Sequence, residues 1–239
     1  MSEWWTYTLQ DFLMFSPRTY FRMFELYNRE IWPAQIAAIL LGFAVLFLLR
    51  RPTAAGSRVV CAALAACWLW VAVAFHIHRY TGIFTAAVYI GAAFVLEAVL
   101  FFIEGVLAGR LLFVPASRSA RRAGLAIFLL ALALYPIIGP ILGRPWRQMQ
   151  LFGVAPDPTA VATLALLLLI QGRARWELWI VPILWCAVSA ATLGAMKAPD
   201  AWILIALAGV AAALAIRESL RRRRSGPGVP GVVPASRAN

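Results

Sequence analysis

Long apolar stretches follow one another from residue 31 to residue 216, and the segments that join them alternate between arginine-rich and arginine-poor. A helix needs roughly 20 mostly apolar residues to cross the hydrocarbon core of a bilayer. The chain therefore predicts an all-α integral membrane protein with about seven transmembrane helices. The expected spans are residues 31–49, 59–77, 83–107, 124–143, 158–171, 178–195 and 201–216, of which the fifth is short for a full crossing.

The distribution of basic residues predicts an orientation, because Lys and Arg gather in the loops that remain in the cytoplasm. The rich segments contain Arg50, Arg51 and Arg58, then Arg110, Arg118, Arg121 and Arg122, then Arg173 and Arg175, and finally Arg217 with Arg221, Arg222, Arg223 and Arg224. The segments between them contain Arg79, then Arg144 and Arg147, then Lys197. We expect the N-terminus outside and the C-terminus in the cytoplasm.

The composition excludes a water-soluble domain. The chain is 63% hydrophobic and 13% charged with a mean hydropathy of +0.80, whereas soluble domains carry about 25% charged residues. The net charge of +12 would suit nucleic acid, but a nucleic-acid binder shows a basic stripe on a folded face. Here the arginines lie in short connectors and at the end, so we expect no nucleic-acid partner. The expected partner is the lipid bilayer, with Arg221, Arg222, Arg223 and Arg224 contacting anionic headgroups at the cytoplasmic face.

The N-terminal segment predicts an amphipathic interfacial helix rather than a span. Ser16 and Pro17 form a favourable helix start, with serine as N-cap and proline at the first helical position. Residues 18–31 then mix aromatic and charged side chains, which suits the headgroup layer. Residues 1–30 are expected to form this outer segment, residues 31–216 the helical bundle, and residues 217–239 a basic, flexible cytoplasmic tail.

Ionisable residues inside spans are costly and mark candidate functional sites. Glu97 is expected near mid-membrane, within a turn or two of Tyr135, either protonated or strongly hydrogen-bonded. Two interpretations stay open for it: a hydrogen bond that holds helices together, or a protonatable group on a transport path. Glu104, seven residues on, is expected to pair with Arg58 or Arg110 at the cytoplasmic interface.

His76 and Asp157 complete the candidate polar path. His76 falls near the outer end of the second span, where an ordinary boundary histidine is the favoured interpretation. Asp157, followed by Pro158, is interpreted as the N-cap of a helix at the outer surface. The sharper alternative is a substrate-contacting loop, since prolines at residues 136, 140, 145, 156 and 158 interrupt this region and broken helices often line cavities.

Several activities are excluded by missing residues. The last span has no lysine for retinal, and the two histidines lie on one helix, so they cannot clamp a haem between helices. The three cysteines form no CxxC pair, and no hydrolase, metalloprotease or nucleotide motif occurs. We therefore expect no cofactor, no metal and no enzymatic activity.

Three segments together resemble a family of bacterial polytopic membrane proteins classified only as a domain of unknown function. They are residues 27–35, the Phe75-His76 pair and residues 152–159, and the resemblance extends over about residues 12–216. It implies an inner-membrane, multi-pass protein and draws attention to a candidate junction formed by Asn28, Trp32, Pro33 and Gln35. In that family the proline loop often carries cysteine; its absence here puts a thiol-based role in doubt.

Two functional hypotheses follow. The first is a small-solute or proton-coupled permease, with Glu97 as its intramembrane protonatable group. The alternative is a non-transporting membrane scaffold, sensor or accessory subunit, whose partner would be a second copy of the chain or another membrane protein. The few polar residues around Glu97 keep this alternative open. An intramembrane enzyme is disfavoured because no nucleophile–base set is found.

Overall fold

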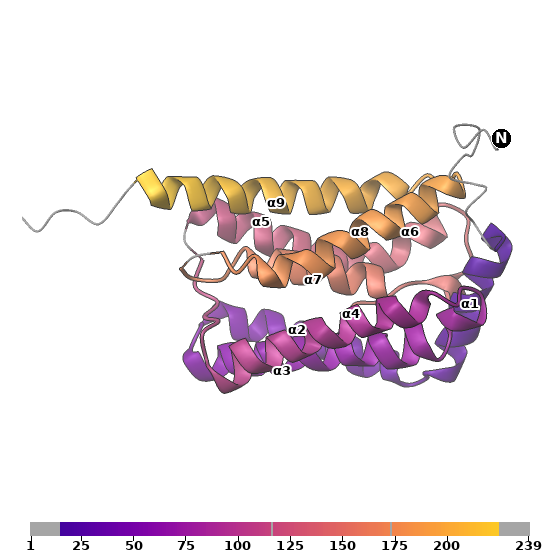
Figure 1. Cartoon of the computed structure of the whole chain (residues 1–239), viewed down its shortest axis with the longest axis horizontal. Helices are drawn as coiled ribbons and strands as arrows, with labels where there is room; N and C mark the ends of the chain where they lie inside the picture. The colour runs from indigo at the N-terminus through magenta and orange to yellow at the C-terminus, as the bar shows by residue number, and fades with distance from the viewer. Residues whose placement is uncertain (1–14, 116, 173, 225–239) are drawn as a thin grey trace, which may run out of the picture.

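The described part of the chain is built from helices packed in two layers. The computed structural model describes residues 15–115, 117–172 and 174–224, and it contains no strand within these ranges. Figure 1 shows α2, α3 and α4 in one layer and α5 to α9 in the other, with α1 at one end of the bundle. The helices of both layers run roughly along one direction. An all-helical membrane fold is therefore confirmed at this level.

The chain enters the bundle through two helices at nearly a right angle. Helix α1 (Pro17–Glu30) begins as expected, because the Ser16 side chain accepts a hydrogen bond from the Thr19 backbone amide. Helix α2 (Ala34–Arg50) follows after a break, and the two axes differ by 88°. The expectation that α1 lies on the headgroup layer is wrong in one respect. Its aromatic face, including Tyr20, Phe24 and Tyr27, is buried against the protein rather than lipid.

Two long helical segments complete the first layer. Helix α3 (Ala54–Trp70) continues into a π-helical stretch, η3 (Val71–Ile77), and a short 3₁₀ turn, η4 (Tyr80–Gly82), leads back. Helix α4 (Ala87–Leu100) likewise continues as π-helix in η5 (Phe101–Leu107). π-Helical turns are rare and are frequent at functional sites. They shift the faces that the ends of α3 and α4 present to the interior.

The second layer begins after a connection at the arginine-rich end. Helix α5 (Arg118–Leu129), the π-helical η6 (Leu130–Leu134) and α6 (Tyr135–Ile141) form one continuous segment. A short 3₁₀ turn, η7 (Trp146–Gln148), follows at the opposite end. The chain then returns through α7 (Pro156–Leu167), α8 (Glu177–Ala195) and α9 (Ala201–Arg224).

Helix α7 is the centre of the molecule. Every residue from Leu151 to Ile170 is buried, and α7 contacts α3, α5, η6, α8 and α9. A helix buried on all sides is expected to be apolar all round, and α7 departs from this in burying Asp157, Thr159 and Thr163. Because the segment before α7 is buried without being helical, its backbone polar groups must find partners inside the protein.

Helix length and hydropathy make the chain a multi-pass membrane protein. Five segments are long and apolar enough to span a bilayer by themselves, and a sixth results if α1 and α2 count as one bent span. The five are Ala54–Gly82, Ala87–Leu107, Arg118–Ile141, Glu177–Ala195 and Ala201–Arg221. The expected fifth span corresponds to α7, which has 12 residues and is too short to cross alone.

The tail differs from the expectation in its first part. Helix α9 continues to Arg224, so residues 217–224 are helical rather than flexible. Arg221 is exposed on this helix. The side chains of Arg222, Arg223 and Arg224, like residues 225–239 and residues 1–14, lie outside the described part of the structure.

Glycine at residue 124 allows α5 to lie directly on α7. A Cβ atom at Gly124 would come within 2.8 Å of the Ala165 backbone oxygen and 2.7 Å of the Leu169 side chain. We therefore expect Gly124→Ala to lower the free energy of unfolding by about 1–3 kcal/mol, because the backbone carbonyl cannot move away. Thermal unfolding in detergent measures this effect.

The control is Gly209→Ala in α9, where a Cβ atom meets no atom within 4 Å. This variant should be neutral or slightly stabilising, since alanine favours helix over glycine by about 1 kcal/mol. Equal unfolding temperatures for the two variants would show that α5 and α7 are not in close contact.

Candidate functional site

The Asp157 carboxylate lies in the interior, where three helices meet. The Tyr135 hydroxyl of α6 donates a hydrogen bond to Oδ2 at 3.1 Å, and the Trp185 indole N–H of α8 donates to Oδ1 at 2.9 Å. The Asp157 side chain is fully buried. Tyr135 is six residues from the end of α6 and Trp185 ten from the end of α8, which puts the carboxylate roughly 9–15 Å below the arginine-poor end.

The position of Asp157 corrects the sequence interpretation. Asp157 is not the N-cap of α7: that position belongs to Ala155, with Pro156 as the first helical residue. Nor does it lie at the outer surface, because the chain descends into the protein before α7 begins. An acidic residue in the first turn of a helix interacts favourably with the exposed backbone N–H groups there. The carboxylate is therefore held both by side chains and by the start of α7.

Thr159 supplies the partners that the buried, non-helical approach to α7 requires. Its hydroxyl accepts a hydrogen bond from the Gly153 amide at 2.9 Å and donates one to the Ala155 carbonyl at 2.6 Å. One turn on, the Thr163 hydroxyl donates to the Thr159 carbonyl and accepts from the Trp68 indole N–H. These bonds explain how an irregular segment can be buried in this part of the protein.

Aromatic and hydroxyl groups from other elements border the Asp157 carboxylate. Tyr20 of α1 and Tyr80 of η4 lie close enough to interact electrostatically with it. Ser189 of α8 borders both Asp157 and Tyr20. All of these side chains are buried. We call Asp157 and the side chains that border it (Tyr20, Tyr80, Tyr135, Trp185 and Ser189) the polar cluster. Helix α1 covers this cluster from the arginine-poor end.

His76 is buried among aromatic rings, which contradicts the interpretation of a boundary histidine. It has no exposed surface, and its ring centre lies 4.4 Å from that of Phe94 and 4.9 Å from that of Trp185. Neither ring nitrogen has a hydrogen-bond partner within the described residues. His76 is therefore separated from the Asp157 carboxylate by one indole ring.

Glu97 is equally buried but lacks the expected partner. Its side chain is fully shielded, and neither carboxylate oxygen accepts a hydrogen bond from the described part of the chain. The interpretation of Glu97 as an interhelical hydrogen bond is therefore wrong, and Tyr135 binds Asp157 instead. An isolated charge in such surroundings is very costly, so a protonated carboxyl group fits this site best.

The candidate junction holds the loop that leads to α7. The Asn28 side-chain amide donates hydrogen bonds to the carbonyls of Arg147 and Met149, at 2.9 and 2.8 Å. Gln35 in turn donates to the Asn28 carbonyl at 2.6 Å. Trp32 and Pro33 are exposed in the break between α1 and α2, and Pro33 precedes the first residue of α2. Of the four residues, Asn28 and Gln35 therefore make the contacts.

Tyr27 extends the same junction into the interior. Its hydroxyl donates a hydrogen bond to the Val154 carbonyl at 2.7 Å and accepts one from the Trp70 indole N–H at 3.0 Å. It therefore joins α1, α3 and the segment before α7.

Ion pairs close the arginine-poor end above the cluster. Arg144 pairs with Asp200, and its guanidinium carbon lies 4.5 Å from the centre of the Phe21 ring of α1. Arg79 pairs with Glu30 at the end of α1. These contacts join α1, the loop after α6 and the turn between α8 and α9 into one cover.

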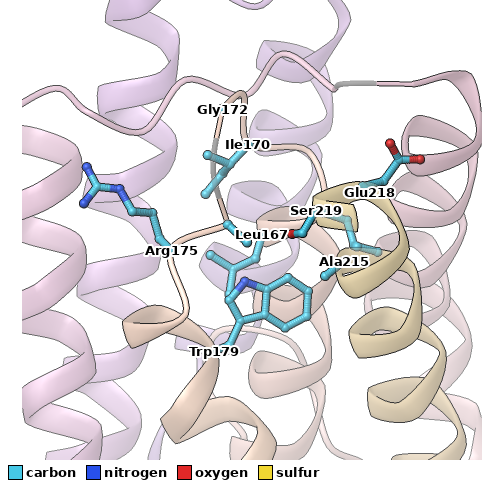
Figure 2. A pocket seen from close by; sticks show the side chains of 10 residues that line it. Leu167, Ile170, Gly172, Arg175, Trp179, Ala215, Glu218 and Ser219 are labelled. Carbon is cyan, nitrogen blue, oxygen red and sulfur yellow. The ribbon is translucent and has the colours of Figure 1, made fainter. Parts of the chain in front are cut away.

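The arginine-rich end is held by a different set of contacts. Glu104 pairs with Arg110 at 2.9 Å, as expected, and also with Arg175 at 3.3 Å. Beside them, at the far end of α7, lies a small pocket of about 30 Å³, room for about one water molecule. Figure 2 shows Arg175 and Glu218 on opposite sides of this pocket, with the Trp179 ring between them.

Metal-binding geometry is not found in the described part of the chain. No three His, Cys, Asp or Glu side chains come together there. Cys61, Cys67 and Cys186 are buried and free. The described site instead brings together a carboxylate, hydroxyl groups and an indole N–H, which can exchange hydrogen bonds.

The family follows from a comparison of the whole chain with known proteins. Residues 18–226 match the model of a family described as a family of unknown function, DUF6064. The chain belongs to this family. The match covers the described helices except Pro17, the first residue of α1, and confirms the resemblance seen in the sequence. Comparison of this DUF6064 chain with curated proteins and with solved structures found no match.

Sequence reasoning missed several residues of this candidate site. Trp185 and Ser189 lie on a span that carries no charge near them, so nothing in the pattern singles them out. Tyr20 was assigned to an interfacial helix, although its spacing from Phe24 and Tyr27 gives one aromatic face. The pair of Arg144 and Asp200 joins two loops distant in sequence, and only the fold brings them together.

Loss of the Asn28 side chain should loosen the loop before α7. Asn28→Ala removes two hydrogen bonds to backbone carbonyls, at a cost of about 1–2 kcal/mol in local stability. We expect trypsin to cleave after Arg147 several-fold faster in this variant, as followed by mass spectrometry. The neighbouring exposed substitution Arg29→Ala should leave that rate unchanged. Equal rates for Asn28→Ala and wild type would contradict the assigned role.

Proposed function

We propose that this protein is a proton-coupled permease for a small solute rather than an enzyme. The observation that carries the proposal is the complete burial of Asp157, His76 and Glu97 inside a membrane domain. Ionisable groups at such depth are expensive, and proton relays and substrate paths are their usual roles. Asp157 replaces Glu97 as the central group, because it alone of the three has hydrogen-bonding neighbours in the described structure.

The form of α7 supports this proposal. Transporters often bind substrates and coupling ions where a helix is interrupted near mid-membrane. Here a buried, irregular segment meets the start of a half-length helix, and a carboxylate occupies the junction. The two described carboxylate contacts, from Tyr135 and Trp185, come from different helices. A shift of either helix would therefore change the proton affinity of Asp157.

The ends of the bundle suggest a closed state in a transport cycle. On one side α1 and the pair of Arg144 and Asp200 lie above the cluster. On the other side Glu104 binds Arg110 and Arg175. If the contacts at one end broke while those at the other end stayed intact, water would enter the interior from one side at a time. Alternating access of this kind is the general scheme of secondary transporters.

We further propose seven crossings in the inner membrane of a bacterium, with the N-terminus outside and the C-terminus in the cytoplasm. Helix α2 supplies one crossing beyond the five long segments, and the descending segment plus α7 supplies another. The arginine-rich loops then share one side, as the positive-inside rule requires.

Proton flux into liposomes tests the transport proposal. Purified protein is reconstituted with a trapped pH dye, and a potassium gradient with valinomycin imposes a membrane potential. We expect wild type to acidify the interior faster than empty vesicles, and both Asp157→Asn and Glu97→Gln to lose at least about tenfold of that flux, because each removes a titrating proton site. The exposed variant Glu177→Gln is the control and should retain the wild-type rate.

Glu97→Gln is the cleaner of the two variants. Since no described residue donates a hydrogen bond to Glu97, the amide replaces the carboxyl group without breaking a contact, and the protein should fold normally. Wild-type flux no greater than that of empty vesicles would rule out a proton path that conducts without the solute, and full flux in both variants would rule out Asp157 and Glu97 as its proton sites.

One observation favours the alternative of a non-transporting scaffold or accessory subunit. The Asp157 contacts are internal to the chain, as in a polar network that only holds helices together. In that case Asp157→Asn should cost little, because the amide oxygen can still accept from the Trp185 indole N–H while the Tyr135 hydroxyl turns to accept from the amide N–H. The flux measurement separates the two functions, and a silent wild type would direct attention to a membrane protein partner or a second copy.

Thiol labelling of intact and permeabilised cells tests the orientation. The native cysteines are buried, so single exposed cysteines can be introduced by Ala54→Cys at the arginine-rich end and Thr85→Cys at the other. We expect a membrane-impermeant reagent to label Thr85→Cys in spheroplasts and Ala54→Cys only after permeabilisation. The reverse pattern would invert the orientation, and labelling of both in spheroplasts would contradict the span assignment.

A further inference from the structure

A basic hollow lies at the arginine-rich end, where α2 ends and α5 begins. Its volume is about 400 Å³, and Arg50, Arg118 and Arg121 line it together with Leu49 and Pro52. Leu49 and Arg50 are the last two residues of α2, whereas Arg118 and Arg121 belong to the first turn of α5. Segments far apart in the sequence thus bring three guanidinium groups to one place.

The three arginines of this hollow outnumber the nearby carboxylate of Glu218 in α9, which accepts a hydrogen bond from the lining residue Ser117 at 2.7 Å. No carboxylate lines it, and no ion pair involves Arg50, Arg118 or Arg121 within the described residues. All three arginines are exposed. The backbone N–H groups at the start of α5 add positive potential, of which Ser117 satisfies the Ala120 amide. The hollow therefore suits an anion with several acceptor oxygens.

An apolar stripe leads away from the same place along α2. Leu40, Phe43 and Phe47 recur at helical spacing and are 58–69% exposed. A second hollow, of about 410 Å³, lies beside Phe47 and Leu48 and shares Arg50 with the first. A basic hollow that continues into an apolar stripe is complementary to the two parts of a phospholipid, its charged headgroup and its acyl chains.

We propose that this hollow binds the phosphate of an anionic phospholipid, whose acyl chains lie along Leu40, Phe43 and Phe47. Arg118 and Arg121 contact the phosphate from α5, and Arg50 contacts it from the end of α2. Arginine is suited to this role because its planar guanidinium binds phosphate oxygens in pairs. Because the occupant joins α2 to α5, it would strengthen the contact between the two layers.

A binding measurement with matched variants tests this site. Fluorescent phosphatidylglycerol is titrated into the purified full chain in detergent, with phosphatidylcholine as the zwitterionic comparison. We expect Arg118→Gln with Arg121→Gln to weaken phosphatidylglycerol binding roughly 30-fold, since each basic side chain near an anionic lipid contributes about a factor of five.

The control carries the same loss of charge outside the hollow. Arg122→Gln with Arg217→Gln removes two exposed arginines from α5 and α9 at the same end, and its affinity should stay within about twofold of wild type. Both double variants are first compared by thermal unfolding without lipid, so that a folding defect is seen directly. If the Arg118 and Arg121 pair unfolds early, Arg50→Gln replaces it, with an expected loss of about fivefold.

Three results would overturn the proposal. Equal losses in both double variants would mean that diffuse charge attracts the lipid. Equal affinity for phosphatidylcholine would mean that the headgroup charge is not recognised. Displacement of the lipid by inorganic phosphate at equal concentration would mean that the hollow binds a free anion without using the apolar stripe.

Discussion

The hydrogen bonds that hold the Asp157 carboxylate between α6 and α8 fix the arrangement on which the rest of the structure depends. They anchor the start of α7 inside the protein rather than at its surface. Because α7 contacts α3, α5, α8 and α9, its position determines how the two layers meet. The backbone N–H and C=O groups of the irregular segment before α7 then need hydrogen-bond partners inside the protein, and the side chains of Thr159 and Tyr27 provide them.

The cover at the arginine-poor end follows from this arrangement. The chain descends into the protein before α7, and α1 covers this end of the bundle with Tyr20, Phe24 and Tyr27. Asn28 then holds the loop before α7, and Arg144 joins Asp200 beside it. Burial, hydrogen bonding and closure of this end are thus parts of one structural solution, and the proposed proton path uses the same residues.

The sequence predicted what depends on local pattern. Hydropathy predicts a multi-pass helical protein, although only five of the seven expected spans, or six with the bent pair α1 and α2, are long and apolar enough. The Ser16 start of α1 and the pairing of Glu104 with Arg110 also follow from local pattern. The contacts in the interior could not be predicted from the sequence. An Asp-Pro helix start has the same local pattern at a surface and in a core, and only the fold shows that Asp157 lies in the core. The burial of Glu97 and His76 depends on which helices pack against α3 and α4, and His76 lies in the π-helical η3, which the sequence does not reveal. Trp185 and Ser189 carry no local signal at all.

Amide hydrogen exchange of residues 151–155 tests the central claim most directly. This segment is not helical, so its amides should exchange quickly if it lies at the membrane surface. In the arrangement described, Gly153 donates to Thr159, Val154 and Ala155 donate to Leu151, and the whole segment is buried. We expect exchange as slow as in α7 itself and far slower than in residues 142–148. Exchange as fast as in that outer loop would contradict this arrangement.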